Sequence, residues 1–144
     1  MGRDNITLGY ELYTFLALLV IFFAVALRLR TLDAAGRVFL VLMVAGGIAA
    51  LYGISQDFGW DPISPGEDGA RSLGTFGNPI FFGAFLLMAV FATVAVALQA
   101  RASGQTAMFV LAIVILGIEL AGLWSTQSRG PLYGTAVGMI AFGV

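Results

Sequence analysis

Long, uniform apolar runs constrain this chain more than any other feature. The 144 residues are 60% hydrophobic and only 10% charged, whereas about 25% of the residues of a soluble domain are charged. Apolar runs without alternation indicate helices rather than barrel strands, because lipid offers backbone groups no hydrogen-bond partners. We therefore predict an all-α fold, a polytopic transmembrane helix bundle in which residues 1–144 form a single, partial membrane domain.

The apolar runs predict four full membrane spans plus a truncated fifth. A hydrocarbon core of about 30 Å needs about 20 apolar residues. Runs of about this length, counted with their flanks, cover residues 12–27, 38–55, 78–98 and 107–124. The fifth run begins at Pro131 and has only about 14 residues at 1.5 Å each, too few to span. A polar loop, broken by glycine and proline, joins the second and third spans over residues 57–77.

The first apolar run has a second interpretation. The sequence Ala24-Val25-Ala26 resembles the cleavage site of a signal peptide. Against this, Asp4 and Glu11 offset the positive charge that a signal peptide carries at its start, and Arg28 follows the run as a stop-transfer flank would. We predict an uncleaved first span.

The distribution of arginine predicts the orientation of the spans. The two loops expected on one side carry Arg28, Arg30, Arg37 and Arg101. The positive-inside rule places these loops in the cytoplasm, so that the N-terminus, the 57–77 loop and the 125–130 turn lie outside. Five aromatic residues gather near the outer boundary, either as an interfacial belt or as packing residues: Tyr10, Tyr52, Trp60, Trp124 and Tyr133.

The stretch over residues 71–84 combines charge, special backbone chemistry and the start of a span. Asn78 is suited to cap a helix and Pro79 to occupy its first position. Gly74 and Gly77 permit unusual backbone angles and leave Thr75 in a tight turn. Because a helix N-terminus carries partial positive charge and free N–H groups, Arg71 beside it predicts an anion site.

A second stretch, over residues 124–131, repeats this pattern. Gln127 and Ser128 precede Arg129, Gly130 interrupts the chain, and Pro131 is suited to open the fifth helix. The third and fifth spans run in the same direction, so both helix N-termini and both arginines should face an anion held between them. Arginine suits phosphate oxygens because its planar fork donates two parallel hydrogen bonds. The alternative is that Arg71 and Arg129 are interfacial anchors that extend to water.

Glu119 lies inside the fourth span, where an ionisable group is costly and usually has a partner. Arg129 or Arg71 is the expected partner in a structural ion pair, and a proton relay is the alternative role. The four-residue spacing of Gly130, Gly134 and Gly138 predicts a small-residue stripe for close helix packing.

The run Gly-Thr-Phe-Gly-Asn-Pro over residues 74–79, followed later by Ser128-Arg129-Gly130, resembles the O-antigen ligase and polymerase family of bacterial envelope glycosyltransferases. The resemblance implies an inner-membrane enzyme that transfers a glycan from an undecaprenyl-diphosphate-linked donor to a lipid or sugar acceptor on the outer face, without metal or other cofactor. Arg71 and Arg129 would then bind the donor diphosphate. Residues expected to support them are Gly74, Thr75, Gly77, Asn78, Pro79, Glu119, Gln127, Ser128 and Gly130.

The chain departs from that family in ways that limit the expected function. Family members carry further helices and an outer loop with a catalytic histidine, whereas this chain has no histidine. We expect a fragment that lacks the base for the acceptor hydroxyl, is inactive alone, and works with the rest of the protein or a separate subunit. The net charge of −1 predicts no nucleic-acid partner. The alternative function is a non-catalytic membrane protein, either a transporter or flippase fragment or a scaffold subunit.

Overall fold

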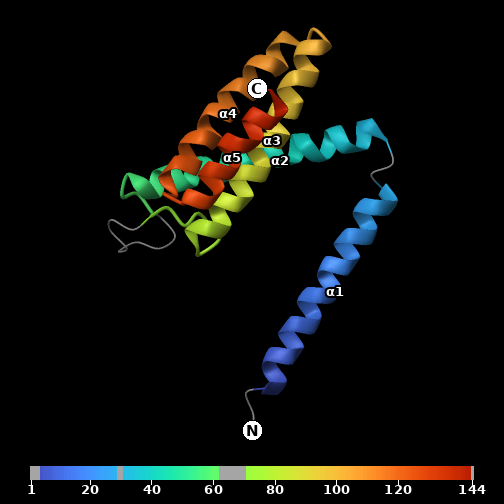
Figure 1. Cartoon of the computed structure of the whole chain (residues 1–144), viewed down its shortest axis with the longest axis vertical. Helices are drawn as coiled ribbons and strands as arrows, with labels where there is room; N and C mark the ends of the chain where they lie inside the picture. The colour runs from blue at the N-terminus through green and yellow to red at the C-terminus, as the bar shows by residue number, and fades with distance from the viewer. Residues whose placement is uncertain (1–3, 29–30, 62–70, 144) are drawn as a thin grey trace. The chain divides into compact units, whose positions relative to one another are not determined.

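The computed structural model describes residues 4–28, 31–61 and 71–143, and every regular element within these ranges is an α-helix. The helices are α1 (Asp4–Arg28), α2 (Leu32–Asp57), α3 (Pro79–Ala102), α4 (Thr106–Ser125) and α5 (Arg129–Phe142). The chain divides into two compact units, Met1–Arg37 and Val38–Val144, and α2 runs from the first into the second (Figure 1). The prediction of an all-α fold is confirmed for the described residues.

Three of the described helices are long and apolar enough to cross a membrane: Leu32–Asp57, Pro79–Ala102 and Thr106–Ser125. Within α1, the apolar stretch among the residues whose side chains are described is Phe15–Val25. The prediction of a helical membrane protein is therefore confirmed, and three of the four predicted full spans are found. The fifth helix is short, as predicted, with 14 residues.

Two helix starts differ from the sequence prediction for local reasons. Helix α2 begins at Leu32 rather than near 38, because the Thr31 hydroxyl accepts a hydrogen bond from the Ala34 N–H at 3.2 Å and so caps the first turn. Helix α5 begins at Arg129, two residues before Pro131, since proline is tolerated throughout the first helical turn. The predicted 57–77 loop agrees with the end of α2 and the start of α3, and its residues 62–70 lie outside the described ranges.

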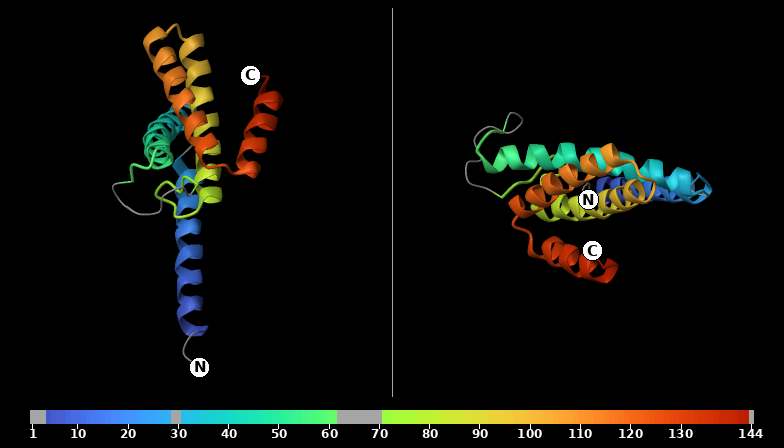
Figure 2. Two further views of the ribbon diagram at one scale, coloured as in Figure 1. Left: turned by 90° about the vertical axis from the view of Figure 1, so that its left-hand side faces the viewer. Right: turned by 90° about the horizontal axis from the view of Figure 1, so that it is seen from above.

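The second unit is built around α3. Helices α3 and α4 form an antiparallel pair, and α5 returns along α3 (Figure 2). Helix α2 crosses the pair at glycines: an added Cβ at Gly46 would meet Ala89, and one at Gly53 would meet the Phe82 ring. Small residues at such crossings let helix backbones approach closely. The core beside this crossing contains Ala50, Phe82, Leu86 and Leu123.

The predicted glycine stripe of α5 is a packing surface at two of its three positions. An added Cβ at Gly134 would lie 2.9 Å from Leu87, and one at Gly138 would meet the Phe91 ring, so both glycines admit side chains of α3. Gly130 has no atom within 4 Å of the Cβ position, and its assignment to the packing stripe is therefore wrong. The first turn of α5 is open at this residue.

Candidate functional site

The start of α3 has the geometry that its sequence predicts. Asn78 has extended backbone angles, and its side-chain oxygen accepts a hydrogen bond from the Ile80 N–H at 2.8 Å, while Pro79 occupies the first helical turn. Ahead of the cap, Gly74 and Gly77 have φ angles of 56° and 65°. Both lie in the left-handed region that glycine adopts most easily, as predicted for this turn.

The end of α2 holds the 71–77 segment in place through side chains that the sequence prediction missed. The side-chain amide oxygen of Gln56 (Oε1) accepts hydrogen bonds from the Leu73 N–H at 3.1 Å and the Gly74 N–H at 2.8 Å. Gln56 is itself oriented by Asp61, which accepts from its amide at 2.9 Å and from the Tyr52 hydroxyl at 2.6 Å. These contacts fix the backbone on which Arg71 is carried.

Arg71 connects the two predicted stretches directly. Its Nε donates to the Thr126 carbonyl oxygen at 2.9 Å, and its Nη2 donates to the Gln127 carbonyl at 3.0 Å and the Ser128 hydroxyl oxygen at 2.9 Å. The Ser128 hydroxyl in turn donates to the Pro79 carbonyl at 2.9 Å. The starts of α3 and α5 therefore lie together at one end of the unit, and we call this cluster of Arg71, Pro79 and residues 126–130 the junction.

The N-terminus of α5 is the open side of the junction. Arg129 and Gly130 are its first two residues, and their N–H groups have no acceptor within the helix. The Ser128 side chain makes no capping bond to α5, because its hydroxyl serves Arg71 and Pro79 instead. Among the described residues the exposed Arg129 side chain has no hydrogen bond or ion pair. This end of α5 thus offers free donors and positive charge.

The N-terminus of α3 contributes less than predicted to such a site. Pro79 has no N–H, and the Ile80 N–H already donates to Asn78. The positive end of the α3 dipole still faces the junction. Thr75 is exposed on the preceding turn, and no hydrogen bond of its side chain is found within the described ranges.

Gln127 has a strained backbone at the centre of the junction. Its φ angle is 50°, and in the described part of the chain it is the only residue other than glycine with a positive φ. Such a conformation costs about 1–3 kcal/mol. The carbonyl of this strained residue accepts a hydrogen bond from Arg71.

We expect Gln127→Gly to stabilise the chain by about 1 kcal/mol, because glycine adopts positive φ without steric conflict. The measurement is the unfolding midpoint in detergent micelles. Gln105→Gly, at a residue with φ of −83°, is the matched control and should give no gain. A loss of stability in Gln127→Gly equal to that of the control would contradict the assignment of strain.

Glu119 does not pair with either arginine. Its side chain is fully buried in α4, and within the described residues neither carboxyl oxygen has a hydrogen-bond partner. Arg71 binds the junction carbonyls, and Arg129 is exposed at the start of α5. The predicted ion pair is therefore wrong, because Glu119 faces the α2 and α3 side of its helix, at Gly46 and Ala89.

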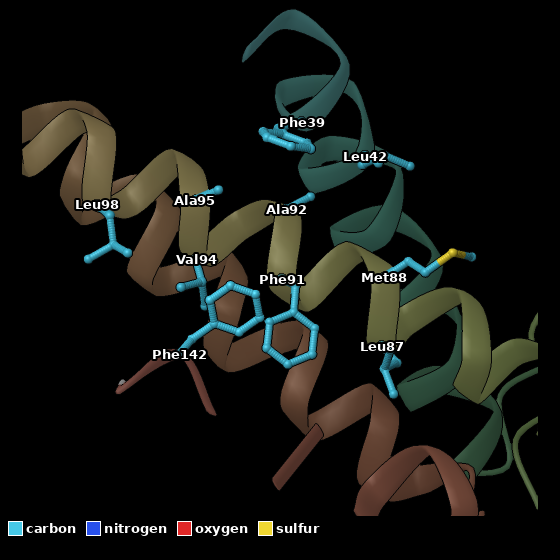
Figure 3. A pocket seen from close by; sticks show the side chains of 10 residues that line it. All are labelled: Phe39, Leu42, Leu87, Met88, Phe91, Ala92, Val94, Ala95, Leu98 and Phe142. Carbon is cyan, nitrogen blue, oxygen red and sulfur yellow. The ribbon is translucent and has the colours of Figure 1, made fainter. Parts of the chain in front are cut away.

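An apolar pocket of about 660 Å³ lies farther along α3 (Figure 3). Phe39 and Leu42 line it from α2, and Phe142 lines it from α5. Its other lining residues belong to α3: Leu87, Met88, Phe91, Ala92, Val94, Ala95 and Leu98. Leu87, which lines the pocket, packs against Gly134 of α5.

Three exposed aromatic side chains lie at the ends of helices near the junction. Trp60, Trp124 and Tyr133 are 70%, 73% and 68% exposed. These three are therefore not packing residues of this unit, whereas Tyr52 is half-buried and donates to Asp61. The side chain of Tyr10 lies outside the described residues.

Comparison with protein families, curated proteins and solved structures finds no match to this chain.

Proposed function

We propose that the chain is part of an integral-membrane glycosyltransferase of the O-antigen ligase or polymerase type in a bacterial inner membrane. In this proposal the junction holds the diphosphate of an undecaprenyl-diphosphate-linked glycan donor at the outer face. The observation that carries it is the open N-terminus of α5, where Arg129, which has no partner in the described part of the chain, lies next to the residues that Arg71 binds. The N-terminus and the 57–77 loop are then outside, as the arginine distribution predicts.

A diphosphate matches the donors that the junction leaves free. The Arg129 guanidinium offers a planar fork for two phosphate oxygens. The N–H groups of Arg129 and Gly130 point along the positive end of the helix dipole, and Gly130 leaves space beside them. Arg71 keeps Nη1 without a hydrogen bond among the described residues. Together these groups supply positive charge and directed donors.

The proposed contribution to the reaction is electrostatic. As the bond between the sugar and the diphosphate breaks, negative charge grows on the diphosphate, and fixed positive groups stabilise that charge most in the transition state. The chain contains no histidine, so the proposal assigns to it donor binding alone. Activation of the acceptor hydroxyl is assigned to another part of the protein or to a separate subunit.

The pocket along α3 supports a donor with a lipid tail. Leu87, at its near end, follows Pro79 by eight positions, which corresponds to about 12 Å along a helix. An anionic head at the junction and an apolar chain in the pocket are thus compatible with one amphipathic molecule. The transporter alternative expects helices broken near the membrane midplane, whereas α3 and α4 are continuous over 24 and 20 residues.

The test is binding of undecaprenyl diphosphate to the purified chain in lipid nanodiscs. We expect Arg129→Ala to weaken binding about tenfold or more, which corresponds to about 1.4 kcal/mol. Arg129→Lys should recover part of the affinity, because lysine keeps the charge but loses the fork. Neutral undecaprenol should bind the wild type and Arg129→Ala equally.

Arg101→Ala is the matched control for charge. Arg101 is exposed in the last turn of α3, far along the helix from Pro79, and its guanidinium lies over the Phe109 ring at 5.7 Å from the centroid. This variant removes the same charge and should leave diphosphate binding within about twofold of the wild type. Equal losses in Arg101→Ala and Arg129→Ala, or no loss in either, would refute the proposed site.

A further inference from the structure

Two unsatisfied polar side chains face each other inside the helical core, away from the junction. Glu119 of α4 and Thr93 of α3 are both 0% exposed. Thr93 is the polar neighbour of the Glu119 carboxyl. Within the described residues, however, the two carboxyl oxygens and the Thr93 hydroxyl make no hydrogen bond of good geometry. Buried polar atoms are usually paired, so each exception requires an explanation.

The position of the carboxyl is built into the helix crossing. A Cβ added at Gly46 of α2 would meet both Ala89 and the Glu119 carboxyl, so the missing side chain of Gly46 leaves the volume that the carboxyl occupies. Gly122, one turn later in α4, lets Ala50 of α2 approach in the same way. The carboxyl therefore lies among α2, α3 and α4 and is fully buried.

The charged and titratable groups of the surrounding helices lie too far along their axes to compensate Glu119. On the part of α2 that belongs to this unit, Tyr52 and Asp57 are six and eleven positions from Gly46, about 9 Å and 16 Å along the axis. On α3, Arg101 follows Thr93 by eight positions, or about 12 Å. Helix α4 holds no other ionisable residue. On α5, Arg129 and Tyr133 are exposed.

An isolated carboxylate in a low-dielectric interior is too costly to persist unless a positive charge accompanies it. Within the described residues no basic side chain pairs with the carboxyl, and a bound cation would neutralise it. We propose that Glu119 and Thr93 form an occluded binding site for one monovalent cation, either a proton or a sodium ion. The carboxyl supplies the charge and two oxygens, and the Thr93 hydroxyl supplies a third oxygen.

A membrane-permeant carbodiimide tests this site in the full chain in nanodiscs. The reagent takes up the proton of a carboxylic acid on its nitrogen while the carboxylate oxygen adds to its central carbon, and rearrangement leaves a stable N-acylurea that mass spectrometry detects. We expect modification at Glu119, falling as the pH rises, and no such product in Glu119→Gln. Replacement of potassium by sodium at constant ionic strength should slow modification several-fold if sodium is the bound ion and leave it unchanged if the proton is.

Two outcomes would overturn the proposal. Equal modification of Glu119 by a water-soluble carbodiimide would show that the carboxyl is open to solvent. No modification at any pH in sodium-free medium would show that the carboxyl never takes up a proton there. Thr93→Val keeps the shape but removes the hydroxyl, and should change the pH or sodium dependence at least about threefold.

Thr135→Val is the control for the loss of a buried hydroxyl, because Thr135 donates to the Pro131 carbonyl at 2.9 Å within α5. It should leave modification of Glu119 unchanged. If Thr93→Val also behaves like the wild type, Thr93 is not part of the site. The test of undecaprenyl diphosphate binding changes Arg129, whereas the test of the cation site changes Glu119 and Thr93. Failure of one proposal therefore leaves the other testable.

Discussion

Replacement of Arg71 by alanine should destabilise the second unit by about 2–4 kcal/mol. The side chain donates three hydrogen bonds to the turn between α4 and α5, and bonds from a charged donor contribute about 1.5–3 kcal/mol each when well shielded. Partial exposure of Arg71 reduces that sum. The carbonyl of the buried Thr126 loses its shorter hydrogen bond and keeps only the one from the Ser128 hydroxyl at 3.4 Å, which adds to the loss.

The measurement is the unfolding midpoint in detergent micelles, together with amide hydrogen exchange over residues 125–132. Exchange should accelerate in this turn and less in the middle of α3. Arg71→Lys should recover only part of the stability, since an ammonium lacks the planar fork that reaches two carbonyls and a hydroxyl. Arg101→Ala controls for lost charge and should cost less than about 1 kcal/mol. A stability equal to that of wild type in Arg71→Ala would contradict the role assigned to this side chain.

Replacement of Gly46 by alanine should destabilise the chain by about 2–3 kcal/mol, although alanine normally stabilises a helix relative to glycine. The added methyl group would collide with Ala89 and with the Glu119 carboxyl. The same substitution at Gly117, which has no atom within 4 Å of its Cβ position, should stabilise by about 0.5–1 kcal/mol. The two variants therefore differ in sign.

Unfolding midpoints of Gly46→Ala and Gly117→Ala in the same detergent provide the comparison. Gly117 belongs to α4 and is exposed, so its variant reports helix propensity without packing. If both variants are stabilised, the crossing of α2 over α3 and α4 is looser than the structure indicates. If Gly46→Ala alone is destabilised, the close approach at this glycine is confirmed.

Features set by neighbouring residues were predictable from the sequence. The Asn78 cap, Pro79 in the first turn and the positive φ angles at Gly74 and Gly77 follow from side-chain and backbone chemistry within a few positions. Apolar runs likewise predicted three of the spans. The extra length of α2 was not predicted, because its first turn is polar and its cap at Thr31 lies outside the apolar run.

Features set by distant residues were not predictable from the sequence. Charge alone suggested that Arg71 would face an anion or Glu119, whereas its guanidinium donates to backbone carbonyls, which every residue possesses and no sequence pattern marks. Glu119 points instead toward Gly46, because the face that a buried residue presents depends on how helices cross. The positive φ of Gln127 is also a tertiary effect, since its own side chain disfavours it.

The long sequence separation of the Arg71 contacts has a consequence for biosynthesis. Its partners lie 55 to 57 positions downstream, so a nascent chain emerging from the ribosome displays this arginine well before Ser128 has been made. Helices α3 and α4 precede these partners in the chain, so both are synthesised before the start of α5 can meet the guanidinium. Closure of this contact is therefore a late step in the assembly of the unit.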